Sequence, residues 1–100
     1  MTVIYAPRAR HEIELILETI AARSLKGSDS VSRAIERTIQ SCEQFPRAAA
    51  RTSRKGVFRK PVVAFKYTVY YRILGDSAIE VLRVRHSARV RNLRSFPRTP

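Results

Sequence analysis

Hydrophobic side chains recur every three to four residues in the first half of the chain and every two residues in the second half. From Pro7 to about Leu25, this spacing is kept by Ile13, Ile16, Leu17 and Ile20. A second stripe of the same period ends before Pro46 and consists of Val31, Ala34, Ile35, Thr38, Ile39 and Cys42. Both patterns predict amphipathic helices that bury one face. We expect Gly27 to stop the first helix and Ser28 or Asp29 to cap the second, which gives an antiparallel hairpin.

Alternating apolar and polar residues predict strands on both sides of these helices. The opening "TVIY" is one short strand, and "VFRKPVV", "YTVYYRIL" and "AIEVLRVRH" are three more, with a turn at Gly75 and Asp76 between the last two. Pro61 places its strand toward an edge or a bulge, because proline has no backbone N–H to donate. The last strand is apolar on both faces, as in a central strand covered by helices. The basic segment 47–55 lacks periodicity and is predicted to be a loop.

The order of strand, helix, helix and three strands defines the fold class α+β. An N-terminal strand precedes an antiparallel helical hairpin and a three-stranded antiparallel meander, and the helices pack on one face of the small sheet. The chain length predicts a single domain, which we place at 1–94, followed by a short flexible tail at 95–100. Alternation along the middle strand of the meander puts Tyr71 and Tyr70 on opposite faces, so at least one tyrosine is expected under the helices.

Positive charge is concentrated in the second half of the chain. The whole sequence has 20 Lys and Arg against 8 Asp and Glu, a net charge of +12. Residues 1–43 hold six side chains of each sign, whereas residues 44–100 hold fourteen basic and two acidic ones. This asymmetry predicts an acidic partner, which is nucleic acid, an anionic protein or an acidic inhibitor. The candidate binding residues are Arg47, Arg51, Arg54, Arg59, Arg83, Arg85, His86, Arg89, Arg91 and Arg94.

Scarce residue types exclude several other classes of protein. No apolar run approaches the ~18 residues that a membrane helix needs, and the first ten residues lack the pattern of a secretory signal. The single cysteine, Cys42, cannot form an intramolecular disulfide and is expected to be a small buried side chain. Two isolated histidines and one cysteine make no metal site, and no cofactor is expected. We therefore expect a cytoplasmic protein that does not bind a membrane.

Four features of the sequence are informative together: the order of elements, "FP" at the end of the second helix, "YTVYYRI" and "IEVLRVRHSAR". In these features the chain resembles the RelE/ParE superfamily of toxins from bacterial type II toxin-antitoxin modules. The resemblance covers about Val3 to Leu93, and the run from Tyr67 to Arg89 is its most specific part. It implies a hetero-oligomer with a ParD-like antitoxin, whose extended, acidic C-terminal segment would lie against the arginines.

The superfamily has two branches, and the sequence is more similar to one of them. RelE-like toxins cut messenger RNA on the ribosome, whereas ParE-like toxins inhibit DNA gyrase and have no known catalytic site. RelE-like toxins carry an arginine where the aromatic strand begins and another just after the last strand, positions held here by Thr68 and Ser87. Conversely, "HSAR" is similar to ParE-like and plasmid-stabilisation sequences. The resemblance therefore favours a ParE-like gyrase inhibitor, for which no catalytic residue is expected.

Two alternatives stay open at this point. As an endoribonuclease that acts with the ribosome and messenger RNA, the chain would use His86 as base, with Arg59, Arg72, Tyr71 or Arg89 close by. A lone histidine at a strand end is more often a hydrogen-bonded structural group. The other alternative is a non-toxic, basic nucleic-acid-binding domain. This alternative accounts for the positive charge but for no other feature of the sequence, because neither helix carries a row of side chains that could read bases.

Overall fold

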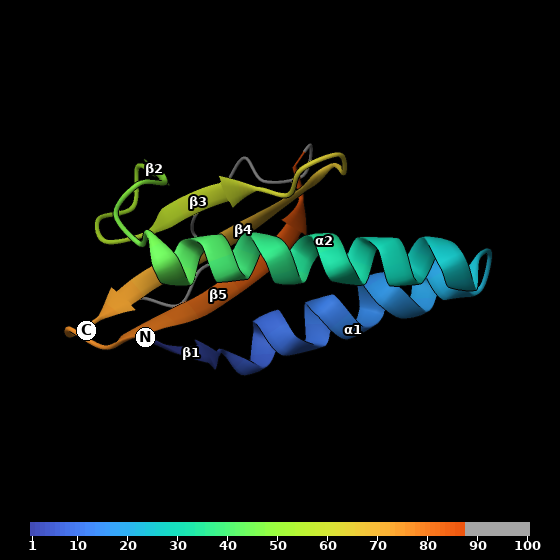
Figure 1. Cartoon of the computed structure of the whole chain (residues 1–100), viewed down its shortest axis with the longest axis horizontal. Helices are drawn as coiled ribbons and strands as arrows, with labels where there is room; N and C mark the ends of the chain where they lie inside the picture. Colours follow the sequence, from blue (N-terminus) through green and yellow to red (C-terminus); the bar gives the residue numbers. More distant parts are fainter. Residues whose placement is uncertain (88–100) are drawn as a thin grey trace.

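The alternating second half of the chain forms most of a mixed five-stranded sheet, and the periodic first half forms two helices on one face of it (Figure 1). This computed structural model describes residues 1–87. Its elements are β1 (Thr2–Tyr5), α1 (Pro7–Ala21), α2 (Leu25–Gln44), β2 (Ala50–Arg51), β3 (Phe58–Pro61), β4 (Tyr67–Leu74) and β5 (Ala78–His86). The predicted α+β class is confirmed, while the predicted domain boundary at residue 94 and the tail 95–100 lie outside the described residues.

The strands are ordered β1-β5-β4-β3-β2. β1 runs parallel to β5, and the other neighbours are antiparallel, so β3, β4 and β5 form the predicted meander. β5 lies between β1 and β4, as its two apolar faces predicted. The sheet has one strand more than predicted, because Ala50 and Arg51 pair with Arg59 and Phe58. The prediction of an entire loop from 47 to 55 was therefore wrong at these two residues.

The boundary between the helices also differs from the prediction. α1 ends and α2 begins earlier than expected, so Gly27 belongs to the first turn of α2. The cap is Ser24, whose hydroxyl accepts the Gly27 N–H at 2.9 Å and satisfies a donor that the helix leaves unpaired. Gly27 suits this turn, because a Cβ there would lie 3.2 Å from the Ser24 hydroxyl oxygen. Ser28 and Asp29 are thus not caps, and Ser28 instead donates to the Leu17 carbonyl at 3.0 Å, which ties the helices together.

The pairing of β4 with β5 distributes the tyrosines over both faces of the sheet. The register slips by one residue between Tyr70 and Tyr71, which leaves Leu82 as an extra residue, a bulge, in β5. Tyr71 packs with Cys42 of α2 on the helix-covered face. Tyr70 packs with Leu82 on the opposite face. The predicted alternation of β4, with a tyrosine under the helices, is confirmed.

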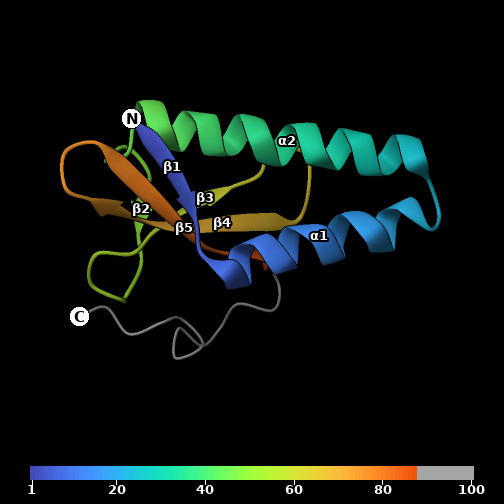
Figure 2. The same ribbon diagram turned by 90° about the horizontal axis from the view of Figure 1, so that it is seen from below.

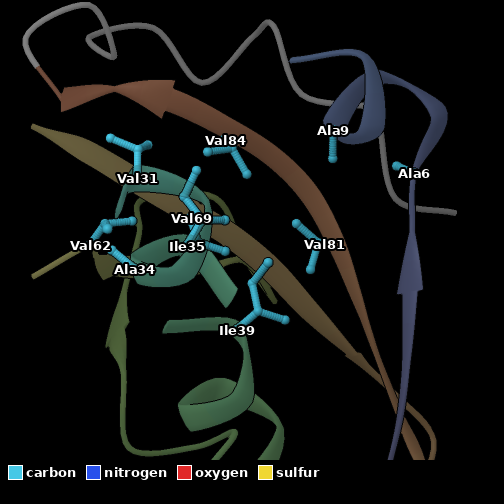
Figure 3. Packing of buried hydrophobic residues seen from close by; sticks show 10 residues of the cluster. All are labelled: Ala6, Ala9, Val31, Ala34, Ile35, Ile39, Val62, Val69, Val81 and Val84. Atoms are coloured by element: carbon cyan, nitrogen blue, oxygen red, sulfur yellow. The ribbon is translucent and has the colours of Figure 1, made fainter. Parts of the chain in front are cut away.

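The main core lies between the helices and the sheet (Figure 3). Its fully buried members come from α2, the strands β4 and β5, the start of α1 and the connection between β3 and β4; they are Ala6, Ala9, Val31, Ala34, Ile35, Ile39, Val62, Val69, Val81 and Val84. The predicted stripe of α1, from Ile13 to Ile20, is only partly buried and packs around this cluster. α2 therefore supplies most of the buried helical surface, and α1 completes it beside β5.

The helical hairpin is longer than the sheet that it covers, and the turn between its helices projects beyond the strands (Figure 2). Leu25 at this turn is 79% exposed. Neither helix is long and apolar enough to cross a membrane, a statement that covers residues 1–87.

Candidate functional site

One threonine side chain holds the basic segment after α2 in a fixed turn. Thr52 donates its N–H to the Val57 carbonyl at 3.0 Å, and its hydroxyl donates to the same carbonyl at 2.9 Å. The hydroxyl oxygen also accepts the Arg54 N–H at 3.1 Å. Gly56 completes the turn with a φ of +80°, a conformation that strains other residues. The cationic side chains of this segment therefore project from an ordered backbone.

An open cleft of about 370 Å³ lies where this turn meets the end of β4. It is lined by cations of the turn, an apolar floor and two glycines, namely Arg47, Arg51, Lys55, Gly56, Val57, Phe58, Ile73 and Gly75. No lining residue is acidic. Within residues 1–87, no carboxylate forms an ion pair with Arg47, Arg51 or Lys55. This site, termed the basic cleft below, combines concentrated positive charge with an apolar floor.

A row of contacts joins the basic cleft to the core. The guanidinium carbon of Arg51 lies 5.9 Å from the centroid of the Phe58 ring, within cation–π distance. The Phe58 ring stacks on Tyr71 at a centroid distance of 5.4 Å. The Tyr71 hydroxyl donates to the carbonyl of Pro46 at 2.6 Å, directly before Arg47. Burial raises the pKa of Tyr71, so its hydroxyl keeps the proton that it donates.

The other predicted binding residues are distributed outside the basic cleft. Arg59 is exposed on β3, and its pairing places it on the face that the helices leave uncovered. Arg54 is half-buried in the Thr52 turn. Arg85 is partly exposed near the end of β5, with 27% of its side chain accessible, and its Nε lies 3.9 Å from the Glu12 carboxylate. The remaining candidates, Arg89, Arg91 and Arg94, lie outside the described residues.

Arg83 is buried in an ion pair and does not present its charge to a partner. It is 2% exposed, and its Nε and Nη2 donate to the two oxygens of Glu12 at 2.9 and 2.8 Å. The same carboxylate accepts the N–H of Val84 at 3.2 Å. Glu12 thus bonds to β5 beyond Val81, where the pairing with β1 ends. The prediction of Arg83 as a binding residue is corrected to a role in attaching α1 to the sheet.

The two positions that hold arginines in RelE-like toxins form a neutral pair. The hydroxyl oxygens of Thr68 and Ser87 lie 2.8 Å apart and share a hydrogen bond. Thr68 is 7% exposed in β4, and Ser87 is exposed directly after the end of β5. Stabilising the charge that develops on a phosphate needs cationic groups or several donors aimed at it. A hydroxyl pair bonded to itself supplies neither.

The residues predicted for a ribonuclease do not converge on one point. His86 is half-buried opposite Tyr67, with the two rings edge to face at 5.8 Å. Arg72 is bound to Glu80 at 2.6 Å, and the five residue steps from Tyr67 to Arg72 extend about 17 Å along β4. Tyr71 is fully buried on the helix-covered face. Arg72 and Tyr71 are therefore held away from His86, whereas Arg85 lines the same pocket as His86 and Tyr67.

The thiol of Cys42, a further potential nucleophile, is buried in the core. Cys42 is 2% exposed, and burial raises the pKa of its thiol to about 11, so the thiol is neutral at physiological pH. Among residues 1–87, no three His, Cys, Asp or Glu side chains gather where they could hold a metal ion.

The fold and its surface define a small α+β protein with a helical hairpin on a mixed sheet and a cation-rich cleft. The family described as "ParE toxin of type II toxin-antitoxin system, parDE" matches residues 3–91. The chain belongs to this family. The resemblance to the ParE branch, inferred from the pattern around "HSAR", is thereby confirmed.

One solved structure supports the fold independently. It is described as "Chromosomal ParDE TA system from P. aeruginosa" and matches with a TM-score of 0.63 at 16% sequence identity. The match covers 86% of this chain and 95% of that chain. At this identity the likeness concerns the fold alone. No match was found among curated protein sequences.

Proposed function

We propose that this chain is the toxin of a type II toxin-antitoxin module, that it inhibits DNA gyrase by binding to it, and that a cognate antitoxin neutralises it. The observation that carries the proposal is the hydroxyl pair of Thr68 and Ser87 on a fold of the ParE family. RelE-like chemistry would place cations at these positions. An inhibitor that acts by binding needs a complementary surface and no catalytic base.

The exposed arginines supply such a surface. Arg47, Arg51 and Arg59 are exposed, and Arg85 extends this cationic surface toward the end of β5. We include His86 and the arginines beyond the described residues, Arg89, Arg91 and Arg94, in the proposed surface. An antitoxin with an acidic C-terminal segment would bind these side chains as a hetero-oligomer in the cytoplasm. Gyrase and antitoxin would then compete for the toxin.

A supercoiling assay with purified gyrase and the full chain tests this function. The proposal predicts dose-dependent loss of supercoiling and unchanged relaxation of the same plasmid by topoisomerase I. A general nucleic-acid binder would inhibit both enzymes by coating the plasmid. It would also bind DNA alone, and this binding would weaken by ~10³ between 50 and 200 mM salt if about six phosphates were neutralised. Equal inhibition of both enzymes would therefore overturn the proposal.

Induced expression of the chain in bacterial cells gives a second test of the proposed function. A DNA-damage reporter and messenger RNA integrity are followed in the same culture. Gyrase poisoning predicts early damage signalling with intact transcripts. Prompt transcript cleavage without damage signalling would instead establish a ribonuclease.

A further inference from the structure

We propose that the basic cleft is a docking pocket for a pair of neighbouring residues, one acidic and one apolar, in an extended segment of the partner. The acidic side chain would bind between Arg47, Arg51 and Lys55, and the apolar one would lie on the floor. This inference rests on the proposed function, because it is the antitoxin that would supply the segment.

The charge of the cleft selects an anion. Arg47, Arg51 and Lys55 are exposed, they line one cleft, and no acid lies among the lining residues. Guanidinium groups bind carboxylates through two parallel hydrogen bonds, and a lysine adds a compact charge. Three cations around one space repel each other in the free protein. A carboxylate between them would relieve this repulsion, which strengthens its binding.

The floor of the cleft selects a second, apolar group beside the anion. Val57 and Phe58 are almost completely buried, while Ile73 of β4 is half-buried at the cleft. A free inorganic anion would leave this apolar floor in contact with water. A leucine-sized side chain next to the carboxylate would cover it, at roughly 25 cal/mol per Å² of apolar surface removed from water. The cleft thus fits an acidic residue with an apolar neighbour better than an isolated charge.

A peptide fits the cleft better than a nucleic acid does. Single-strand binders place exposed aromatic rings under successive bases. The one aromatic ring of this cleft, Phe58, is 7% exposed and already stacks on Tyr71 with Arg51 above it. The three cations also surround one space of about 370 Å³, whereas a phosphate backbone would need them in a row.

The cleft is also ordered before any partner arrives. Thr52 fixes the turn that carries Arg51 and Lys55, and the bond from Tyr71 to Pro46 fixes the backbone before Arg47. A site with its backbone already in place loses less conformational entropy on binding.

Fluorescence anisotropy with labelled synthetic peptides tests the proposal on the full chain. The probe is a short peptide of alternating Glu and Leu, measured at about 0.15 M salt. A Gln-Leu peptide lacks the charge, a Glu-Ser peptide lacks the apolar side chains, and an oligothymidylate of equal charge represents nucleic acid. We expect the Glu-Leu peptide to bind more tightly than the other three.

Neutral substitutions then locate the site. Arg51→Gln and Lys55→Gln should each raise the Kd of the Glu-Leu peptide about 5- to 10-fold, as expected for the net contribution of one hydrogen bond at an exposed site. The matched control is Arg37→Gln, which removes the same charge from an exposed position of α2 outside the cleft and should change the Kd less than about 2-fold. All three positions are exposed, so the fold should survive, and circular dichroism checks it.

The proposal is overturned if the cleft substitutions change binding no more than Arg37→Gln, or if the Gln-Leu or Glu-Ser peptide binds as tightly as the Glu-Leu peptide. Tighter binding of the oligothymidylate through the same residues would also overturn it, in favour of nucleic acid. The supercoiling assay is independent of these outcomes. Gyrase inhibition with no peptide binding in the cleft would refute only this inference, and peptide binding without gyrase inhibition would refute the proposed target alone.

Discussion

The hydroxyl of Tyr71, in the middle of β4, donates a hydrogen bond of 2.6 Å to the carbonyl of Pro46, just beyond the end of α2. The two residues are 25 positions apart in the chain. Because Arg47 follows Pro46 and Arg51 lies over the Phe58 ring that stacks on Tyr71, one buried side chain supports both cationic walls of the basic cleft. The core and the candidate binding site are therefore coupled through this tyrosine.

Replacing this hydroxyl should cost stability. We expect Tyr71→Phe to lower the free energy of unfolding by about 1 kcal/mol, the net value of one hydrogen bond. Tyr67→Phe is the matched control, because no hydrogen bond of the Tyr67 hydroxyl is present within residues 1–87. Urea denaturation of both variants measures the difference. A loss in Tyr71→Phe no greater than in Tyr67→Phe would show that the bond to Pro46 does not stabilise the fold.

The ion pair of Glu12 and Arg83 should contribute far more. Glu12→Gln would leave the 2%-exposed guanidinium of Arg83 without its carboxylate, and breaking a buried pair in this way costs about 3–5 kcal/mol. Asp29→Asn is the control. It breaks the pair of Asp29 with Arg33, whose side chains are 61% and 68% exposed, and should cost less than about 0.5 kcal/mol. Urea denaturation again gives the free energies.

A double substitution distinguishes the pair from its surroundings. In Glu12→Gln with Arg83→Met, the uncompensated charge is removed, so the loss should be smaller than the sum of the two single losses. Strict additivity would mean that Glu12 and Arg83 stabilise the protein independently of each other.

The local periodicity of the sequence was enough to predict the helices and the meander, because each pattern is complete within a few turns or one strand. The boundary at Ser24 was not predictable in this way. Gly27 can end a helix or lie in its first turn, and the choice is made by the Ser24 hydroxyl and the lack of space beside Gly27. The strand at Ala50 and Arg51 has no periodicity of its own and exists only because β3 pairs with it.

The candidate site was partly visible in the sequence, since a run of cations without acids can be read directly. The floor of the cleft was not, because Phe58 and Ile73 come from strands whose meeting depends on the whole sheet. Arg83 looked equivalent to Arg85, but Arg83 alone of the two is buried, with two hydrogen bonds to Glu12, which is 71 residues away in the chain. The bulge at Leu82 further changes which side chains share a face, and strict alternation cannot anticipate it.

The protein should become less stable in alkaline solution through Cys42. Burial raises the pKa of this thiol from 9.0 to about 11, so its contribution to stability is intact below pH 9 and is lost as the pH rises toward 11. The loss should be on the order of 2–3 kcal/mol for this group. Tyr71 adds a fall of the same sign at higher pH, because burial raises its pKa too.

Urea denaturation at a series of pH values between 8 and 11 measures this loss. Cys42→Ala should start from a lower free energy of unfolding, because a small cavity is left, but should decline less between pH 9 and 11. An identical decline in Cys42→Ala would mean that the thiol is not responsible. As an independent check, a thiol reagent at pH 8 should modify the wild-type chain only as fast as it unfolds.

The last prediction concerns His86, the residue that a ribonuclease of this fold would use as its base. We expect His86→Ala to retain toxicity, since its ring lies against Tyr67 and no phosphate-binding cations stand at Thr68 and Ser87. The measurement is the survival of cells after induced expression, with the amount of protein compared by immunoblot. His11→Ala, an exposed histidine of α1, is the matched control.

The two mechanisms differ in how much this substitution can change. Removing the base of a ribonuclease lowers the rate by about 10² or more, so toxicity would disappear at equal expression. Removing one half-buried side chain from a binding surface usually changes the free energy by far less, so an inhibitor of gyrase would still kill at a slightly higher dose. Loss of toxicity in a folded His86→Ala, together with loss of transcript cleavage that the wild type shows, would place the reaction at His86. Retained toxicity with intact transcripts would leave the cationic surface as the part of the molecule that acts.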